Sequence, residues 1–182
     1  MKTFTRISLA MAMGTAALPA MAQTPPPPPP PEARTQAAAY VMAAGQSDLY
    51  EINSSQVALE KTQNPALRKY ANMLIKHHMK TTAATMKAAT KAGLTPTPPA
   101  LAPGAVTSIN ELQTAAPADF DRIYLAQQIP AHQAALDLHQ GYAGGGDQRP
   151  LKMSAKAAIP IVQQHLNAAM KMQGGNMAGH KM

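Results

Sequence analysis

The stretch NPALRKYANMLIKHH, residues 64–78, decides the fold class of this chain. Asn64 followed by Pro65 predicts a helix start, because Asn can cap free backbone amides and Pro at the first helical position gives up only an unused donor. Apolar residues then recur at three- and four-residue steps, the period of an amphipathic α-helix. They are Leu67, Tyr70, Ala71 and Leu74, and His78 continues the same stripe. We expect this helix to end before Gly93.

Stretches rich in Ala, Leu, Met, Gln and Lys extend the helical pattern on both sides. Val and Ile are sparse and do not alternate with polar residues, so signals for strands are almost missing. Further helices are predicted from near Thr35 to Gln63, from Pro117 to about Gly141 and from about Leu151 to Met172. Pro130 and Pro160 fall inside the last two and should kink them, since proline removes a backbone donor.

The connection between the second and third long helices is long and rich in proline. Residues 95–103 contain four prolines and predict an irregular crossover. Ser108-x-x-Glu111 resembles a capping box that would open a short helix before Pro117. Two long helices, a longer crossover and two more long helices favour an all-α fold, a ferritin-like four-helix bundle with kinked third and fourth helices.

The first 22 residues have the pattern of a signal peptide. A basic start at residues 1–6 precedes an apolar run from Ile7 to Leu18, and Ala20-Met21-Ala22 supplies a small-x-small cleavage site. The chain contains no cysteine, which excludes a lipid-bearing lipobox and a disulfide. No other stretch reaches the roughly 20 apolar residues of a spanning helix. We expect a periplasmic or secreted protein.

The rest of the chain divides into a linker, one domain and a tail. Residues 23–34 form a proline-rich linker, in which seven prolines at 25–31 predict a stiff polyproline II rod. It is either a passive spacer or a docking site for a proline-binding partner. Residues 35–172 suit one helical domain with a single core. Residues 173–182 form a flexible Met/His tail.

Charge and composition narrow the possible partners and activities. Cleavage removes Lys2 and Arg6 and leaves 14 basic and nine acidic residues, a formal charge of +5. Lys and Arg are scattered along the sequence and Trp is absent, which argues against nucleic acid. A protein partner or an anionic cell-envelope surface remains open, as does the oligomeric state. We recognise no catalytic triad, nucleophile elbow or phosphate loop, so an enzyme has little support.

The histidines are the main candidates for chemistry. Arg68-x-Tyr70, Ile75 and His78 have the same spacing as Arg122-x-Tyr124, Ile129 and His132, and this spacing places both histidines on the inner side of their helices. The fourth long helix adds His165, and the first adds Glu51 on the stripe of Ala44 and Ala58. Buried charged groups are costly unless they are paired or bind metal. The predicted metal ligands are therefore Glu51, His78, His132 and His165.

Three imidazoles and one carboxylate suit Zn, Fe, Mn or Cu. A di-iron oxidase is not expected, because apolar residues stand three positions before each of the three histidines, where Glu-x-x-His would need Glu. The alternative is structural: each histidine bonds a neighbouring residue or a carbonyl freed by a proline, such as that of Ala126 or Lys156. His77 is expected to be exposed or at an edge, and His139 lies near a helix end.

The C-terminal segment is the second chemically suggestive stretch. From Met170 to Met182 it contains four methionines and His180 on a glycine-rich backbone. Thioethers and imidazole are soft ligands that suit Cu(I). The alternative is an ordinary chain end in which Met170 belongs to the core.

Residues from about Ala37 to Met172 resemble a known family. The resemblance rests on Tyr50-Glu51 with Ala58-Leu59-Glu60-Lys61, Ala71-x-x-Leu74-Ile75-x-x-His78, Phe120-Asp121-x-x-Tyr124 with His132, and Pro160-x-x-x-x-His165. The family comprises exported ferritin-like proteins catalogued as a domain of unknown function, number four-one-four-two, and often described as predicted outer-membrane proteins. It implies a four-helix bundle in the cell envelope, without a defined activity.

The chain departs from the usual family pattern at three positions. His77 and Ala131 precede the two histidines, where the family typically has Asp, and Asn53 stands where a second Glu is common. These changes remove carboxylates that could bind or orient a ligand. The leading hypothesis is a core metal site that serves envelope stress tolerance or metal handling. The alternatives are a structural or partner-binding bundle and a Cu(I)-binding tail.

Overall fold

The computed structural model describes residues 24–179 and their side chains as far as Gly175; the predicted signal peptide lies outside this part. Within it the chain is helical and contains no strand, which confirms the all-α prediction. A short 3-10 helix precedes five α-helices. The elements are η1 (Pro31–Arg34), α1 (Ala37–Lys61), α2 (Pro65–Lys91), α3 (Pro103–Thr114), α4 (Phe120–Gly145) and α5 (Arg149–Gly179).

Helix α2 begins and ends as its sequence predicts. The Asn64 side-chain oxygen accepts hydrogen bonds from the backbone amides of Ala66 at 3.0 Å and Leu67 at 3.4 Å. After its last turn the chain passes through Gly93 with a φ of +81°, a conformation that glycine adopts without steric cost. Residues 64–93 therefore carry both boundary signals of this helix.

The predicted capping box in the crossover is wrong. Helix α3 begins at Pro103, five residues before Ser108. The Ser108 hydroxyl donates to the carbonyls of Gly104 and Thr24, and a Glu111 carboxylate oxygen accepts from the amide of Thr24 at 3.1 Å. Proline at a first helical position is itself a start signal, and here it sets the boundary.

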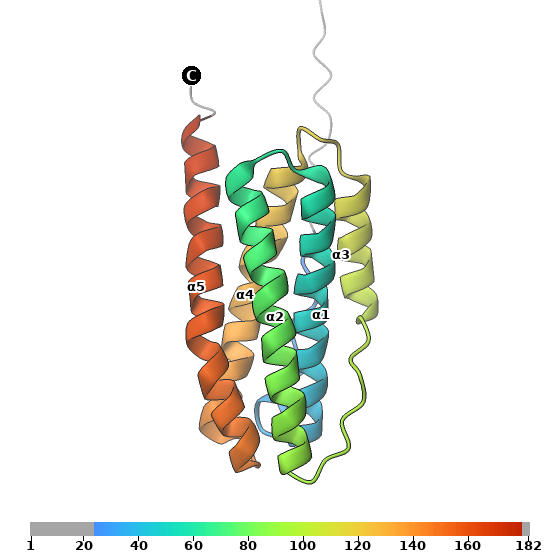
Figure 1. The fold of residues 1–182 in the computed structure, drawn as a ribbon, viewed down its shortest axis with the longest axis vertical. Coiled ribbons are helices and arrows are strands. Elements are labelled where there is room, and N and C mark those ends of the chain that lie inside the picture. The colour runs from blue at the N-terminus through green and yellow to red at the C-terminus, as the bar shows by residue number, and fades with distance from the viewer. Residues whose placement is uncertain (1–23, 180–182) are drawn as a thin grey trace, which may run out of the picture.

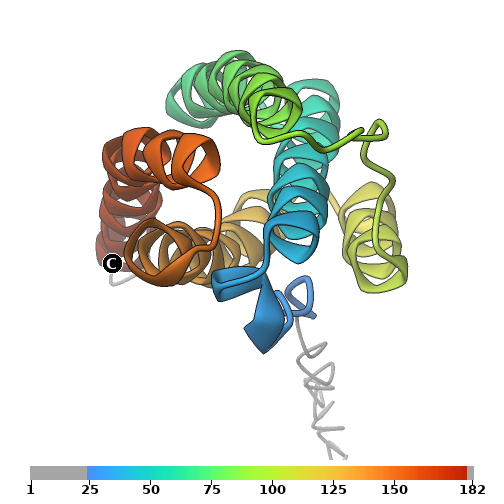
Figure 2. The same ribbon diagram turned by 90° about the horizontal axis from the view of Figure 1, so that it is seen from below.

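Four long helices lie side by side along the long axis of the molecule, and α3 packs outside them against α1 (Figures 1 and 2). Contacts are most extensive between α4 and α5 and between α1 and α2. The crossover from α2 to α3 runs along the outside of the molecule (Figure 1). Three hydrophobic clusters fill the interior, and they contain Tyr40, Tyr50, Leu74, Tyr124 and Leu166 among their members. Met170, which the ordinary-chain-end interpretation of the C-terminal segment places in the core, is 54% exposed.

The proline segment packs against the helices. Residues 26–30 line a cavity of about 240 Å³ together with side chains of α1, α3 and α4, Tyr50 and Ala131 among them. Contact is close at Gly104, where an added Cβ would lie 2.6 Å from Cδ of Pro27. The hydrogen bonds of Thr24 to α3 tether the beginning of the segment.

The structure has no helix, in its described part, with the length and hydropathy required to cross a membrane.

Candidate metal centre

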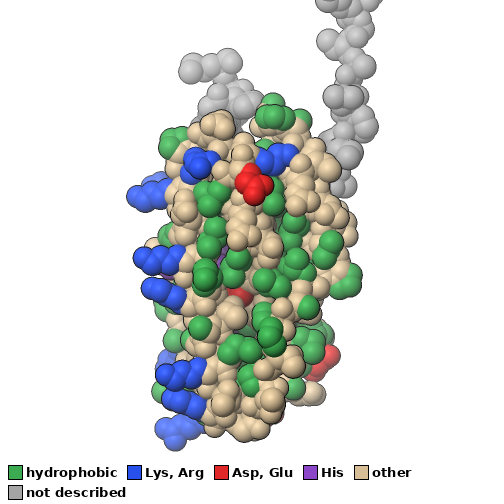
Figure 3. Space-filling model, turned by 45° about the vertical axis from the view of Figure 1, so that its right-hand side comes forward, with side chains coloured by type: hydrophobic (Ala, Val, Ile, Leu, Met, Phe, Trp, Pro, Cys, Tyr) green, Lys and Arg blue, Asp and Glu red, His purple; other side chains and the backbone are tan. Residues whose placement is uncertain are grey.

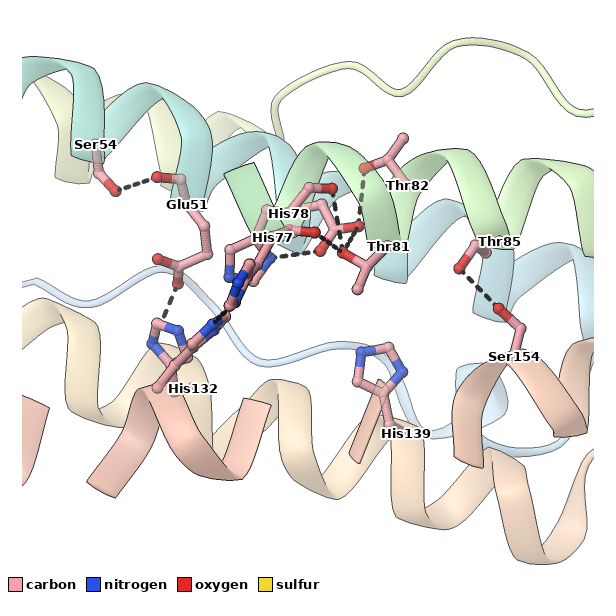
Figure 4. Close-up of polar contacts among 12 residues, drawn as sticks. Glu51, Ser54, His77, His78, Thr81, Thr82, Thr85, His132, His139 and Ser154 are labelled. Carbon is pink, nitrogen blue, oxygen red and sulfur yellow. Dashed lines mark hydrogen bonds and ion pairs between the residues drawn. The ribbon is translucent and has the colours of Figure 1, made fainter. Parts of the chain in front are cut away.

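Three of the four predicted ligands meet in the middle of the molecule. His78 lies on α2, His132 on α4 and His165 on α5, and each is at most 2% exposed. Their ring centroids are 5.1 to 5.7 Å apart. One nitrogen from each ring lies within 4.8 Å of the others. Figure 4 shows His78 and His132 pointing toward each other from facing helices.

The helical periodicity explains this convergence. His78 follows Tyr70 by eight residues and Leu74 by four, and all three are buried on one stripe of α2. His132 has the same relation to Tyr124 in α4, where Gln128 is buried one turn earlier. On α5, His165 lies between Val162 and Leu166, which are both buried.

Each of the three imidazoles uses one nitrogen in a hydrogen bond. Nδ1 of His78 lies 2.7 Å from Oδ1 of Asp48, and Nδ1 of His132 donates to the carbonyl of Gln128 at 2.9 Å. Nε2 of His165 lies 2.9 Å from Nδ1 of His77. The second nitrogens, Nε2 of His78, Nε2 of His132 and Nδ1 of His165, are buried without a hydrogen-bond partner.

Glu51 lies beside the three histidines without belonging to their closest group. Its Oε1 is 3.6 Å from Nδ1 of His132, and its Oε2 is buried and has no hydrogen-bond partner. Burial raises the pKa of Glu51 to about 8, although the charge of His78 acts in the opposite direction. The predicted set is thus brought together as three clustered imidazoles with a carboxyl next to one of them (Figure 4).

Burial keeps two of the rings neutral. It lowers the pKa of His132 to about 3 and that of His165 to about 2, and in both cases the charge of His78 adds to the effect. For His78 burial acts in the same direction, but the hydrogen bond and charge of Asp48 outweigh it, so its pKa is raised. A neutral imidazole nitrogen without a proton is the form that binds metal.

Asp48, which is not among the predicted site residues, accepts or shares a hydrogen bond with His78 and orients its ring. The Asp48 side chain is almost fully buried in α1, and its Oδ2 accepts from the hydroxyls of Thr81 at 3.0 Å and Thr82 at 2.8 Å. A carboxylate that accepts a hydrogen bond from Nδ1 of a histidine fixes the tautomer of the ring. The Nε2 lone pair then points away from the carboxylate. The spacing of Asp48 indicates an inward-facing side chain, because it stands three residues before Glu51 on the same side of the helix, but it does not name His78 as the partner.

The remaining histidines have different environments. His77, expected to be exposed or at an edge, is half-buried, and its ring stacks on His165 with centroids 5.1 Å apart. His139 is buried outside the cluster, and its Nδ1 lies 3.0 Å from the hydroxyl of Tyr40. Under the structural alternative, the backbone carbonyl of Ala126 was one expected partner of a histidine. The Nδ1 of His132 instead donates a hydrogen bond to the backbone carbonyl of Gln128.

Three solved structures with a similar fold are forms of CopM. "CopM in the Cu(I)-bound form" has a TM-score of 0.66 and 17% identity and covers 77% of this chain and 96% of its own. The Ag-bound form has a TM-score of 0.64 and 18% identity, with the same coverage. The Cu(II)-bound form has a TM-score of 0.65 and 16% identity and covers 77% of this chain and 97% of its own. At these identities the similarity supports the fold.

The sequence comparisons identify the family. A search of curated proteins gave no match. A family model described as "Domain of unknown function (DUF4142)" matches residues 22–172, which include all five α-helices except the end of α5. The match covers most of the chain and agrees with the resemblance in the sequence motifs. The chain therefore belongs to the family of the domain of unknown function DUF4142.

Proposed function

We propose that this protein binds a transition-metal ion through His78, His132 and His165, with Glu51 as a fourth ligand. Copper is the metal we favour. We further propose that the protein handles this metal outside the cytoplasm. The observation that carries the proposal is that the three imidazoles bring one nitrogen each within 4.8 Å of the others, while one buried nitrogen of each ring has no hydrogen-bond partner. Each such group costs about 1–3 kcal/mol when left unsatisfied. A cation held between the three rings would give such nitrogens a partner.

The chemistry of the ligands favours a borderline or soft metal. Two of the imidazoles are held neutral by burial, and the third is oriented by Asp48. Imidazole nitrogens suit Zn, Cu, Fe and Ni, so copper lies within the set expected from the sequence. CopM, which shares the fold, is known in forms that bind Cu(I), Cu(II) and Ag. This likeness is the reason for placing copper before zinc.

Metal content and titration test the proposal. The purified chain without residues 1–22 is loaded with Cu(I), Cu(II) or Zn(II), and bound metal is measured by elemental analysis. The double variant His78→Ala, His132→Ala should lose the bound ion. His139→Gln is a matched control, because it alters a buried histidine outside the cluster. A wild-type chain that retains none of these metals contradicts the proposal.

We also propose that α1, α2, α4 and α5 form a ferritin-like four-helix bundle, with α3 inside the crossover and kinks at Pro130 and Pro160. The extensive α1–α2 and α4–α5 contacts support the bundle. Both prolines lie inside helices, where each removes one backbone hydrogen bond.

Cleavage after Ala22 would deliver the domain to the periplasm or the medium. N-terminal sequencing of the exported protein tests this, and a chain that keeps residues 1–22 contradicts it.

A structural or partner-binding bundle is a second candidate. It is favoured by the hydrogen bonds that each clustered histidine already makes, to Asp48, to the Gln128 carbonyl and to His77. On this hypothesis His132→Ala lowers the melting temperature and leaves metal content unchanged. The two candidates therefore differ in one measurement made on one variant.

Copper binding by the C-terminal tail stays a separate hypothesis. Met170 is exposed, whereas Met172 packs against the main hydrophobic cluster. The side chains from residue 176 on lie outside the described part of the structure. Truncation after Met172 should abolish Cu(I) binding if the tail binds the ion, and it should leave the affinity unchanged if the histidine cluster does.

A further inference from the structure

Helix α2 carries a row of lysines that are far apart in the linear sequence but lie on one side of the helix. Lys69, Lys76, Lys80, Lys87 and Lys91, hereafter the lysine stripe, follow one another at intervals of seven, four, seven and four residues. Such intervals return a residue to the same side of an α-helix, and all five side chains are exposed. Basic residues that look scattered along the linear sequence therefore share one side of α2, and the expectation of scattered charge is wrong for this helix. Figure 3 shows Lys and Arg side chains in a column along one edge of the molecule.

No acidic residue balances these charges on the helix itself. Residues 65–91 contain six Lys and Arg and no Asp or Glu. The neighbouring α5, residues 149–179, contains four Lys and Arg and again no Asp or Glu. Two packed helices therefore carry ten of the 16 basic residues of the chain and none of its nine acidic ones. A face of like charge is unfavourable by itself and attracts an anionic partner.

Exposed methionines border the same face. Met79 is 59% exposed and stands next to Lys80 on α2. Met153 of α5 is 65% exposed and lines a groove between α2 and α5 together with Lys87, Lys91 and Arg149. Large apolar side chains at such positions gain from contact with an apolar phase. A partner that offers negative charge and an apolar layer fits both kinds of residue.

We propose that the lysine stripe of α2, with the adjoining end of α5, docks this protein on the surface of an anionic phospholipid bilayer. The stripe spans about 33 Å along the helix axis, at 1.5 Å per residue, which suits an extended planar partner. Lysine ammonium groups interact with phosphate headgroups as point charges without a fixed geometry. The neighbouring methionines reach the boundary between headgroups and acyl chains. The attachment is peripheral and does not depend on the metal site.

Vesicle flotation tests the proposal with the chain from Gln23 on, because the apolar run at residues 7–18 would itself bind lipid. Equimolar phosphatidylglycerol and phosphatidylcholine vesicles should carry the protein at low salt, and pure phosphatidylcholine vesicles should not. The triple variant Lys76→Gln, Lys80→Gln, Lys87→Gln should bind roughly 100-fold more weakly, since each lysine near an anionic surface contributes about a fivefold gain. Raising the salt concentration should release the wild type.

A matched control removes three charges elsewhere. Arg34, Lys61 and Arg122 lie on η1, α1 and α4, outside α2 and α5, and do not line the groove. Changing all three to Gln gives the same net charge as the triple lysine variant and should leave vesicle binding nearly unchanged. Equal losses in both variants would mean that only net charge matters and would overturn the proposal. Wild-type binding to soluble polyglutamate but not to anionic vesicles would also overturn it, in favour of an acidic polymer or protein.

Discussion

At the scale of single residues, the interaction between Asp48 and His78 determines how one candidate ligand is presented. The Asp48 carboxylate accepts from Thr81 and Thr82 while it lies 2.7 Å from Nδ1 of His78. We predict that Asp48→Asn lowers copper affinity by roughly 10- to 100-fold, because the loss of a partner that orients a ligand has effects of this size. Competition titration with a copper chelator measures this loss. Asp119→Asn, which changes an exposed carboxylate, should have no effect.

The same pair of residues illustrates how much of the site could be predicted from the sequence. His78, His132 and His165 lie on apolar stripes, and helical period alone predicts that they face inward. The hydrogen-bond partners of these histidines depend on the relative register of neighbouring helices. The apolar stripe of a single helix does not define this register. Asp48 and His77 were therefore missed as partners although both stand close to predicted ligands in the sequence.

At the scale of elements, the proline segment behaves as part of the helical packing. We predict that Gly104→Ala lowers the free energy of unfolding by about 1–3 kcal/mol, the usual cost of overpacking, because the new Cβ would lie 2.6 Å from Pro27. Urea denaturation measures the change. Gly144→Ala is the matched control in α4, where an added Cβ meets nothing within 4 Å, and it should be neutral or stabilising. An equal loss in both variants would mean that the prolines do not press on α3.

The helices themselves were predictable to different degrees. The ends of α2 carry their own signals at Asn64 and Gly93, and both predictions are confirmed. The start of α3 was wrong because a Ser-x-x-Glu pattern has the same spacing inside a helix as at its beginning, and Ser108 and Glu111 bond Thr24 instead. The lysine spacing of α2 was present in the sequence, but the basic face also depends on the packing of α5 beside α2, which the sequence of one helix does not define.

At the scale of the whole molecule, buried neutral histidines predict that the metal-free protein is sensitive to acid. The pKa of His132 is lowered to about 3, that of His165 to about 2 and that of His139 to about 4, against an ordinary value of 6.5. At a pH between about 4 and 6.5, these three histidines are protonated in the unfolded chain and neutral in the folded chain. The unfolded chain therefore binds three more protons, and the stability of the folded chain falls as the pH drops below 6.5. Glu51 opposes this with one proton, because its pKa is raised to about 8 in the folded chain, and His78, whose pKa is also raised, opposes it above pH 6.5.

The histidines outnumber Glu51, so the midpoint of urea unfolding should be lower at pH 5 than at pH 7. Between pH 6.5 and pH 4.5 the unfolded chain exceeds the folded one by about two protons, counting these four groups. His139→Gln removes one of the three histidines without touching the cluster, and it should reduce the difference between the two pH values. A protein equally stable at pH 5 and pH 7 would mean that the clustered rings accept protons in the folded state, and their neutral lone pairs would then not be available to a metal at mildly acidic pH.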